Sequence, residues 1–248
     1  MRQIFIFSGL IFFCIFNGCV SQNYIVSQKN NTYSIDSQVN RDTSIDNMIT
    51  PYRIKIEGQM GETIAVLDTD LKKEQPESTM GNLVADLMME YCNQKQIKGD
   101  VAVVNYNGLR ITSIGKGNLP RGRVFELMPF DNAVVVLNLN QSQVVQFCDA
   151  MALKGGWHIS KGLYFEILGG KAQNIKINGV ALSETSSYKF VMSDYVANGG
   201  DNCSFLTALP QENANVLLRD LLLQQIEIRT KRGEHLNPVL DGRCVKKG

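Results

Sequence analysis

The sequence predicts an α+β fold in which a mixed β-sheet is layered with helices. Helical and strand-like segments follow one another without the steady strand–helix–strand rhythm of a parallel sheet. An Asn178-Gly179 pair between two apolar runs is typical of a tight antiparallel hairpin. The chain has 248 residues, 44% of them hydrophobic, which is enough for one domain of ordinary size with its own core, a leader and a tether.

The N-terminus has the pattern of an export signal. Residues 1–3 carry a basic charge, and the apolar run over residues 4–16 is shorter than the ~20 residues that a membrane span needs. Gly18 directly precedes Cys19, which resembles a bacterial lipobox. We therefore expect a lipoprotein signal peptide over residues 1–18 and lipid attachment at Cys19, which would anchor the protein to a membrane. An ordinary secretory signal with an incidental cysteine is the alternative.

The segment after Cys19 has the composition of a linker. Residues 19–42 are rich in Ser, Asn and Gln and have no sustained periodicity, so we expect a flexible tether there and a folded domain over residues 43–248. The predicted location is the bacterial cell envelope, on the periplasmic side, because no acidic signal for surface export follows the cysteine.

Periodicity and turn residues define the expected elements of the domain. Apolar residues every three or four positions predict helices, and short apolar runs predict buried strands. Ser78 or Thr79 is placed to cap the second helix. The expected helices are residues 43–60, 80–91, 142–153 and 213–230, and the expected strands are 63–68, 100–105, 133–139, 163–168, 173–178 and 186–192.

Six cysteines are present, of which Cys14 belongs to the leader and Cys19 would carry lipid. The other four contain no C-x-x-C pair, so we expect no zinc site. Four cysteines allow three disulfide pairings, and their spacing does not choose among them. We expect free or partly paired structural cysteines at Cys92, Cys148, Cys203 and Cys244.

Charge and histidine content exclude two classes of function. The net charge is +1 without a basic stripe, which does not predict nucleic-acid binding. A two-metal hydrolase needs several His and Asp ligands, but the chain has only His158 and His235 and none of the usual metal-binding or nucleophile motifs. We therefore expect no metal site and no catalytic residue in this chain, and a structural or surface role for each histidine.

Three polar turns beside predicted strands are candidates for ligand contacts. Asn105 to Arg110 follows a buried strand and can aim an amide and a guanidinium into a cleft. Pro129 to Asn132 holds Phe130 in a loop, where its ring can stack on a base. Ser193 to Asp201 contains a Gly-Gly turn that permits close approach of the backbone.

Each candidate also has an ordinary structural interpretation. The first turn could simply end a strand with an exposed arginine, and Phe130 could be a core residue that plugs its loop. The Gly-Gly-Asp sequence is common turn chemistry. A fourth segment, Glu77 to Asn82, opens the predicted second helix, and we take this as its main role.

Together and in this order, the four segments resemble the C-terminal domain of the 5′-nucleotidase family. The family pattern is Glu-x-x-x-Gly-Asn, Asn-Gly-Gly-Gly-Ile-Arg, Pro-Phe-Gly-Asn, and an aromatic residue followed by Gly-Gly-Asp. Here the corresponding segments are residues 77–82, 105–110, 129–132 and 195–201, and Asp241-Gly242-Arg243 is similar to the family's closing Gly-Arg. The resemblance covers about residues 44–244.

The resemblance implies a nucleotide- or nucleoside-binding site. It implies that Phe130 and Tyr195 sandwich the base and that Asp201 binds the ribose. Stacking contributes about 1–3 kcal/mol per base and tolerates different bases. The resemblance also implies further substrate contacts from three polar side chains: Asn105, Arg110 and Asn132.

This sequence departs from the family pattern in ways that bear on function. Tyr106 and Asn107 replace two turn glycines and would narrow the approach to the ligand, and Asp131 replaces a glycine and would add negative charge near a phosphate. The family's metal-binding half has no counterpart here. Our first hypothesis is therefore one half of a split 5′-nucleotidase, with a separate metallophosphatase chain that supplies divalent metals. A non-catalytic nucleoside-binding module and a structural lipoprotein module without a ligand are the alternatives.

Overall fold

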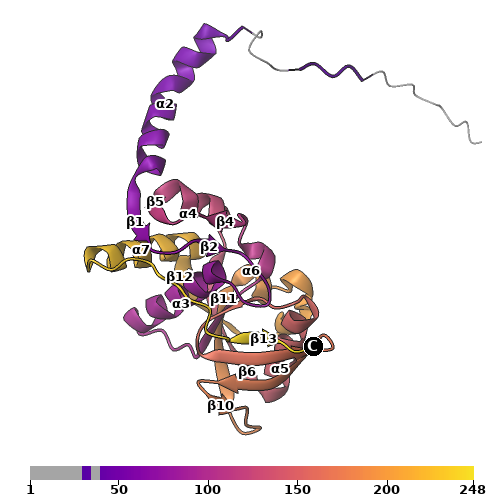
Figure 1. Ribbon diagram of the computed structural model, residues 1–248. Helices are drawn as coiled ribbons and strands as arrows, with labels where there is room; N and C mark the ends of the chain where they lie inside the picture. Colours follow the sequence, from indigo (N-terminus) through magenta and orange to yellow (C-terminus); the bar gives the residue numbers. More distant parts are fainter. Residues whose placement is uncertain (1–29, 35–39) are drawn as a thin grey trace, which may run out of the picture. The chain divides into compact units, whose positions relative to one another are not determined.

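The computed structural model describes residues 30–34 and 40–248 (Figure 1), and residues 48–248 form one compact unit. The predicted signal peptide, the lipid site at Cys19 and most of the tether lie outside the described residues. Helix α2 (Thr43–Gly61) is the first predicted helix, and none of its residues is buried. Within residues 30–34 and 40–248, no helix is both long and apolar enough to cross a bilayer.

The central sheet is mixed, as predicted. β3 and β11 pair in parallel, whereas β6 is antiparallel to β11 and β7 is antiparallel to β3. In spatial order the five strands are β12 (Gln211–Leu217), β6 (Ala133–Asn140), β11 (Ser187–Ser193), β3 (Val101–Val104) and β7 (His158–Ile159).

A second sheet contains the predicted hairpin. Ile177 pairs with Val180 across Asn178 and Gly179, which have φ angles of 50° and 80°, as a tight hairpin turn requires. Its strands in order are β10 (Val180–Ala181), β9 (Lys171–Ile177), β8 (Leu163–Leu168) and β13 (Cys244–Lys246). Two small pairs complete the strands: β1 (Thr63–Leu67) with β5 (Gly117–Pro120), and β2 (Leu71–Lys72) with β4 (Ser113–Ile114).

The central sheet has a hydrophobic core on each face, because successive side chains of a strand point in opposite directions. Ala102 and Val104 of β3 belong to the core that contains the buried faces of α3 (Thr79–Gln94) and α7 (Leu218–Lys231). Val101 and Val103 belong to the other core, under α5 (Gln141–Leu153) and β8. The domain is thus layered, with helices on both faces of the sheet (Figure 1).

The helix starts follow their capping residues. Ser78 caps α3, and its Oγ accepts a hydrogen bond from Gly81 N at 2.9 Å, as the sequence predicted. Asn140 and Gln143 form a reciprocal capping box at the start of α5. Two shorter helices, α4 (Arg121–Leu127) and α6 (Asp194–Ala197), were not predicted.

The predicted helix over residues 213–230 is wrong in its first part. Residues 211–217 form β12, the edge strand beside β6, and α7 begins only at Leu218. Asn215 has a φ of 55° and donates its N–H to Asn213 Oδ1 at 2.7 Å, a local turn that interrupts a helix. The four cysteines of the domain, which could have been partly paired, are all free and buried.

Candidate functional site

The order and direction of the strands bring the three candidate turns to one end of the central sheet. The parallel strands β3 and β11 end at the same side of the sheet, and they lead into Asn105 and Asp194. β6 runs antiparallel to β11, so its beginning lies at that side too, where Val134 pairs with Ser193. The loop before β6, residues 129–132, therefore meets the loops after β3 and β11.

The three loops surround a pocket of about 190 Å³. Asn107 and Gly108 contribute to its wall. The other lining residues are the six predicted contacts: Asn105, Arg110, Phe130, Asn132, Tyr195 and Asp201. The structure thus brings all six together around one opening, and their role in binding a ligand remains a prediction.

A hydrogen bond joins two walls of the pocket. Asn105 Nδ2 donates to Asp201 Oδ2 at 2.5 Å, and in the described structure the other carboxylate oxygen of Asp201 accepts no hydrogen bond. A Cβ atom on Gly108 would lie 2.6 Å from Asn105 Oδ1, so only glycine leaves room for this amide. Asp201 itself has a φ of 52°, a left-handed conformation that aspartate tolerates better than most residues.

The aromatic side chains line the pocket differently. Phe130 is partly buried against the core, and the Arg110 guanidinium lies 4.7 Å from its ring centroid, within cation–π range. Tyr195 is 47% exposed. A Cβ atom on Gly200 would lie 2.4 Å from the Tyr195 ring, so this glycine lets the ring lie across the backbone. The pocket therefore offers two aromatic side chains, one cation and one carboxylate.

Tyr106 and Asp131, which replace glycines of the family pattern, do not point into the pocket as the sequence led us to expect. Tyr106 does not line the pocket, and its ring packs 5.5 Å from the His158 ring, away from the opening; of the two replaced glycines, only Asn107 contributes to the wall. Asp131 does not line the pocket either, and its charge is paired with Arg219 at 2.6 Å. Of the two residues expected to narrow the pocket, Tyr106 thus turns elsewhere while Asn107 adds a side chain to the wall, and the negative charge expected from Asp131 is paired with Arg219.

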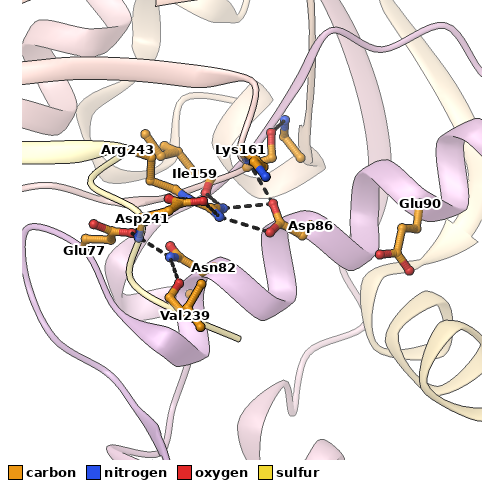
Figure 2. Close-up of polar contacts among 12 residues, drawn as sticks. Glu77, Asn82, Asp86, Glu90, Ile159, Lys161, Val239, Asp241 and Arg243 are labelled. Carbon is orange, nitrogen blue, oxygen red and sulfur yellow. Dashed lines mark hydrogen bonds and ion pairs between the residues drawn. The ribbon is translucent and has the colours of Figure 1, made fainter. Parts of the chain in front are cut away.

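The Glu77 and Arg243 segments meet in a network of polar contacts (Figure 2), and none of its residues lines the pocket. Glu77 accepts hydrogen bonds from Asn82 Nδ2 and from the backbone N–H groups of Asp241 and Gly242, at 2.7–3.0 Å. Arg243, 5% exposed, donates to Asp86 and Asp241 in two-pronged pairs at 2.8–3.1 Å. We call these residues the Arg243 network. It fastens the C-terminal segment to α3.

The two histidines lie apart from the pocket lining. His158 is buried, its Nδ1 lies 3.2 Å from Ser78 Oγ, and burial lowers its pKa to about 4. His235 is exposed and pairs with Asp68 at 2.8 Å. In the described part of the chain, no group of three or more His, Cys, Asp and Glu side chains is arranged to hold a metal ion.

The sequence did not point to two cations that support the pocket loops. Lys73 donates from Nζ to the carbonyl of Leu109 at 2.9 Å, and Arg219 contacts the loop of Phe130. Burial lowers the pKa of Lys73, and the nearby charge of Arg110 adds to this effect. Neither cation belongs to a recognisable motif, because each acts through a contact that only the folded chain creates.

The fold and this pocket define an α+β domain with a polar and aromatic pocket at one end of its central sheet. Among protein families, the one described as 5′-nucleotidase, C-terminal domain, matches residues 58–209, and the chain therefore belongs to this family. This agrees with the resemblance carried by the ordered motifs.

Individual relatives show the same relationship over part of their length. A 5′-nucleotidase of Vibrio vulnificus is 28% identical over 75% of this chain and 34% of its own length, and protein UshA of Escherichia coli is 26% identical over 62% and 28%. This chain thus spans about a third of the curated relatives. The fold matches a 5′-nucleotidase precursor of Thermus thermophilus with a TM-score of 0.70 at 22% identity, over 81% of this chain and 42% of that one.

Proposed function

We propose that this protein is the nucleotide- or nucleoside-recognising half of a split 5′-nucleotidase, whose phosphate ester hydrolysis depends on a separate metallophosphatase chain. The observation that carries the proposal is the convergence of six predicted contact residues around one pocket. We expect divalent metals only in the partner chain, and we assign no metal-dependent step to this one.

The side chains of the pocket fit the parts of a nucleoside. Phe130 and Tyr195 offer rings on which a base can stack, which contributes about 1–3 kcal/mol per base. The free oxygen of Asp201 is suited to accept hydrogen bonds from ribose hydroxyls, and such bonds to a charged group are worth about 1.5–3 kcal/mol. The Arg110 guanidinium suits a phosphate or a sugar hydroxyl.

The pocket is tested by titrating the lipid-free chain, residues 20–248, with adenosine and AMP in a calorimeter. We expect binding that weakens at least about tenfold in Phe130→Ala and Tyr195→Ala, because each variant removes one stacking partner. Tyr52→Ala, which removes an exposed tyrosine of α2 outside the pocket, is the matched control and should bind normally. No binding at millimolar ligand, or equal binding by all variants, would remove the basis of the proposal.

The proposed dependence on a second chain is tested by mixing this protein with a metal-loaded metallophosphatase exported by the same cell. Nucleotide hydrolysis should rise strongly on mixing and should not rise with Phe130→Ala. If the partner is equally active alone, the second candidate gains instead: a non-catalytic module that captures nucleosides. The observation that supports this candidate is that Phe130, Tyr195 and Asp201 line one pocket within this chain alone.

We further propose that the protein is a lipid-anchored protein of the cell envelope, facing the periplasm. The support is the short apolar run and the Gly18-Cys19 pair of the sequence. Metabolic labelling with a fatty acid should mark the protein and should fail in Cys19→Ser. Labelling that persists in this variant would exclude Cys19 as the attachment site.

A further inference from the structure

We propose that Tyr106 and Asp131 are positioning residues that hold the two neighbouring pocket loops in their ligand-binding conformation. Both stand where the family pattern has glycine, and neither lines the pocket. The inference rests on the proposed function, because it concerns the affinity of the same pocket.

Tyr106 fastens the loop that carries Asn105 and Arg110. Its ring lies 5.5 Å from the ring of His158 on β7, with an angle of 31° between the planes, and Lys73 Nζ lies 4.6 Å from the centroid of the Tyr106 ring. The same Lys73 Nζ donates to the carbonyl of Leu109 at 2.9 Å. The loop is thus held through the side chain of Tyr106 and through the backbone carbonyl of Leu109.

His158 provides a rigid base for the Tyr106 ring. It is 3% exposed, and its Nδ1 lies 3.2 Å from the Oγ of Ser78, the residue that caps α3. A Cβ atom on Gly81 would lie 2.1 Å from the same Nδ1, so the ring fits closely against the first turn of the helix. Tyr106 therefore connects a pocket loop to the core through a buried side chain that packs closely against α3.

Asp131 fastens the loop that carries Phe130 and Asn132. Its Oδ1 lies 2.6 Å from Arg219 Nη2, and Arg219 Nη1 lies 3.5 Å from the carbonyl of Phe130. Leu218, the first residue of α7, donates its N–H to the carbonyl of Asn132 at 2.9 Å. The side chain of Arg219 is only 14% exposed and stacks 4.8 Å from the ring centroid of Phe125, so it is itself held in place.

Both loops share one arrangement along the chain. Asn105 and Asn107 line the pocket while Tyr106 between them turns to His158, and Phe130 and Asn132 line it while Asp131 turns to α7. Glycine at the central position would remove the anchor and widen the range of backbone conformations. The apparent affinity falls in proportion to the fraction of molecules whose loops are ordered for binding.

The test restores the family's glycines. In calorimetric titrations of residues 20–248, which retain every described residue, with adenosine, Tyr106→Gly should weaken binding about tenfold and Asp131→Gly about threefold, as expected if the ordered fraction falls correspondingly. Tyr106→Phe and Asp131→Glu keep the ring and the ion pair and should retain most of the affinity. Tyr164→Ala, which removes a partly buried tyrosine of β8 away from the pocket, controls for general destabilisation and should bind normally.

A second readout follows the loops directly. Amide hydrogen exchange of residues 105–110 and 129–132 in the ligand-free chain should accelerate in the glycine variants, and exchange in β6 and α3 should not change. If the natural sequence binds adenosine and both glycine variants bind equally well with unchanged loop exchange, the positioning role is overturned and the proposed function stands. If the natural sequence binds no nucleoside, both are overturned.

Discussion

The pocket and the Arg243 network are built from similar residues but differ in how far their polar groups are satisfied. In the network, Arg243 donates to two carboxylates and a backbone carbonyl, and Glu77 accepts three hydrogen bonds at 2.7–3.0 Å. In the pocket, the only hydrogen bond between two lining side chains that the described structure contains joins Asn105 and Asp201. The charged groups of the network are paired with one another, whereas most polar side chains of the pocket form no hydrogen bond with another lining side chain in the described structure.

This difference separates two roles that look alike in the sequence. Both regions are marked by Asn, Asp, Arg and Gly in short motifs, and both motifs belong to the same family pattern. Buried polar groups without partners are costly, so removing one member of the Arg243 network should destabilise the fold, while an open polar and aromatic surface is available to a ligand. The predictions below test whether stability and binding divide in this way.

The largest expected effect is on the network. Arg243→Ala leaves Asp86, Asp241 and Glu77 close together without their cation, and breaking a buried ion pair of this kind costs about 3–5 kcal/mol in the free energy of unfolding. Urea denaturation measures this loss. Arg232→Ala, which removes an exposed arginine paired with Glu234, should cost less than about 1 kcal/mol. Equal losses in the two variants would mean that the network does not stabilise the fold.

A somewhat smaller effect is expected from His158, which lies between the two regions beside Ser78 and Tyr106. Burial lowers its pKa to about 4, from an ordinary value of 6.5, although a backbone contact with Tyr106 opposes the shift. Between these values the unfolded chain binds a proton that the folded chain excludes. Above about pH 6.5, His158 therefore does not reduce the free energy of unfolding. As the pH drops to 4, its titration lowers the free energy of unfolding by about 3 kcal/mol.

The variant His158→Gln isolates this effect. Its free energy of unfolding, measured in urea from about pH 4 to 7.5, should fall less steeply with acid than that of the natural sequence, because carboxylates titrate in both proteins and cancel in the difference. Parallel curves would show that His158 does not titrate as its burial requires.

The smallest changes in free energy are expected from one matched substitution in the pocket and one in the Arg243 network. Asp201→Asn removes the charge that we expect to bind ribose hydroxyls and should weaken adenosine binding by about 1.5–3 kcal/mol, with little change in stability. Asp241→Asn weakens the pair with Arg243 and should lower stability while adenosine still binds. Calorimetry measures adenosine binding and thermal unfolding measures stability in both variants. If both variants lost adenosine binding, the pocket and the Arg243 network would not have separate roles.

The sequence predicted well the parts of the fold that local patterns determine. The buried strands β3 and β6 are continuous apolar runs, α3 has both a cap and an amphipathic face, and Asn178-Gly179 has the dihedral angles of a hairpin. β12 was missed because it is an edge strand with an exposed, Asn-rich face, and its pairing with β6 is a tertiary contact that no local pattern reports.

The same distinction holds at the candidate site. Six of the lining residues could be named because motifs at fixed intervals mark the turns, and strand direction then brings those turns together. The anchoring contacts could not be predicted, because Lys73 and Arg219 reach the pocket loops from distant segments. The direction of Tyr106 depends on the short helical turn over Tyr106–Gly108, which sends its ring toward His158.

The hydrogen bond between Asn105 and Asp201 spans 96 positions of the chain and has a further consequence for folding. Contacts so distant in sequence form only after the intervening strands have assembled, so the pocket is complete only in the fully folded molecule. A nucleoside would then bind the native state alone and raise the melting temperature as its concentration rises. Ligand-dependent melting would thus report whether residues 105–201 have finished folding.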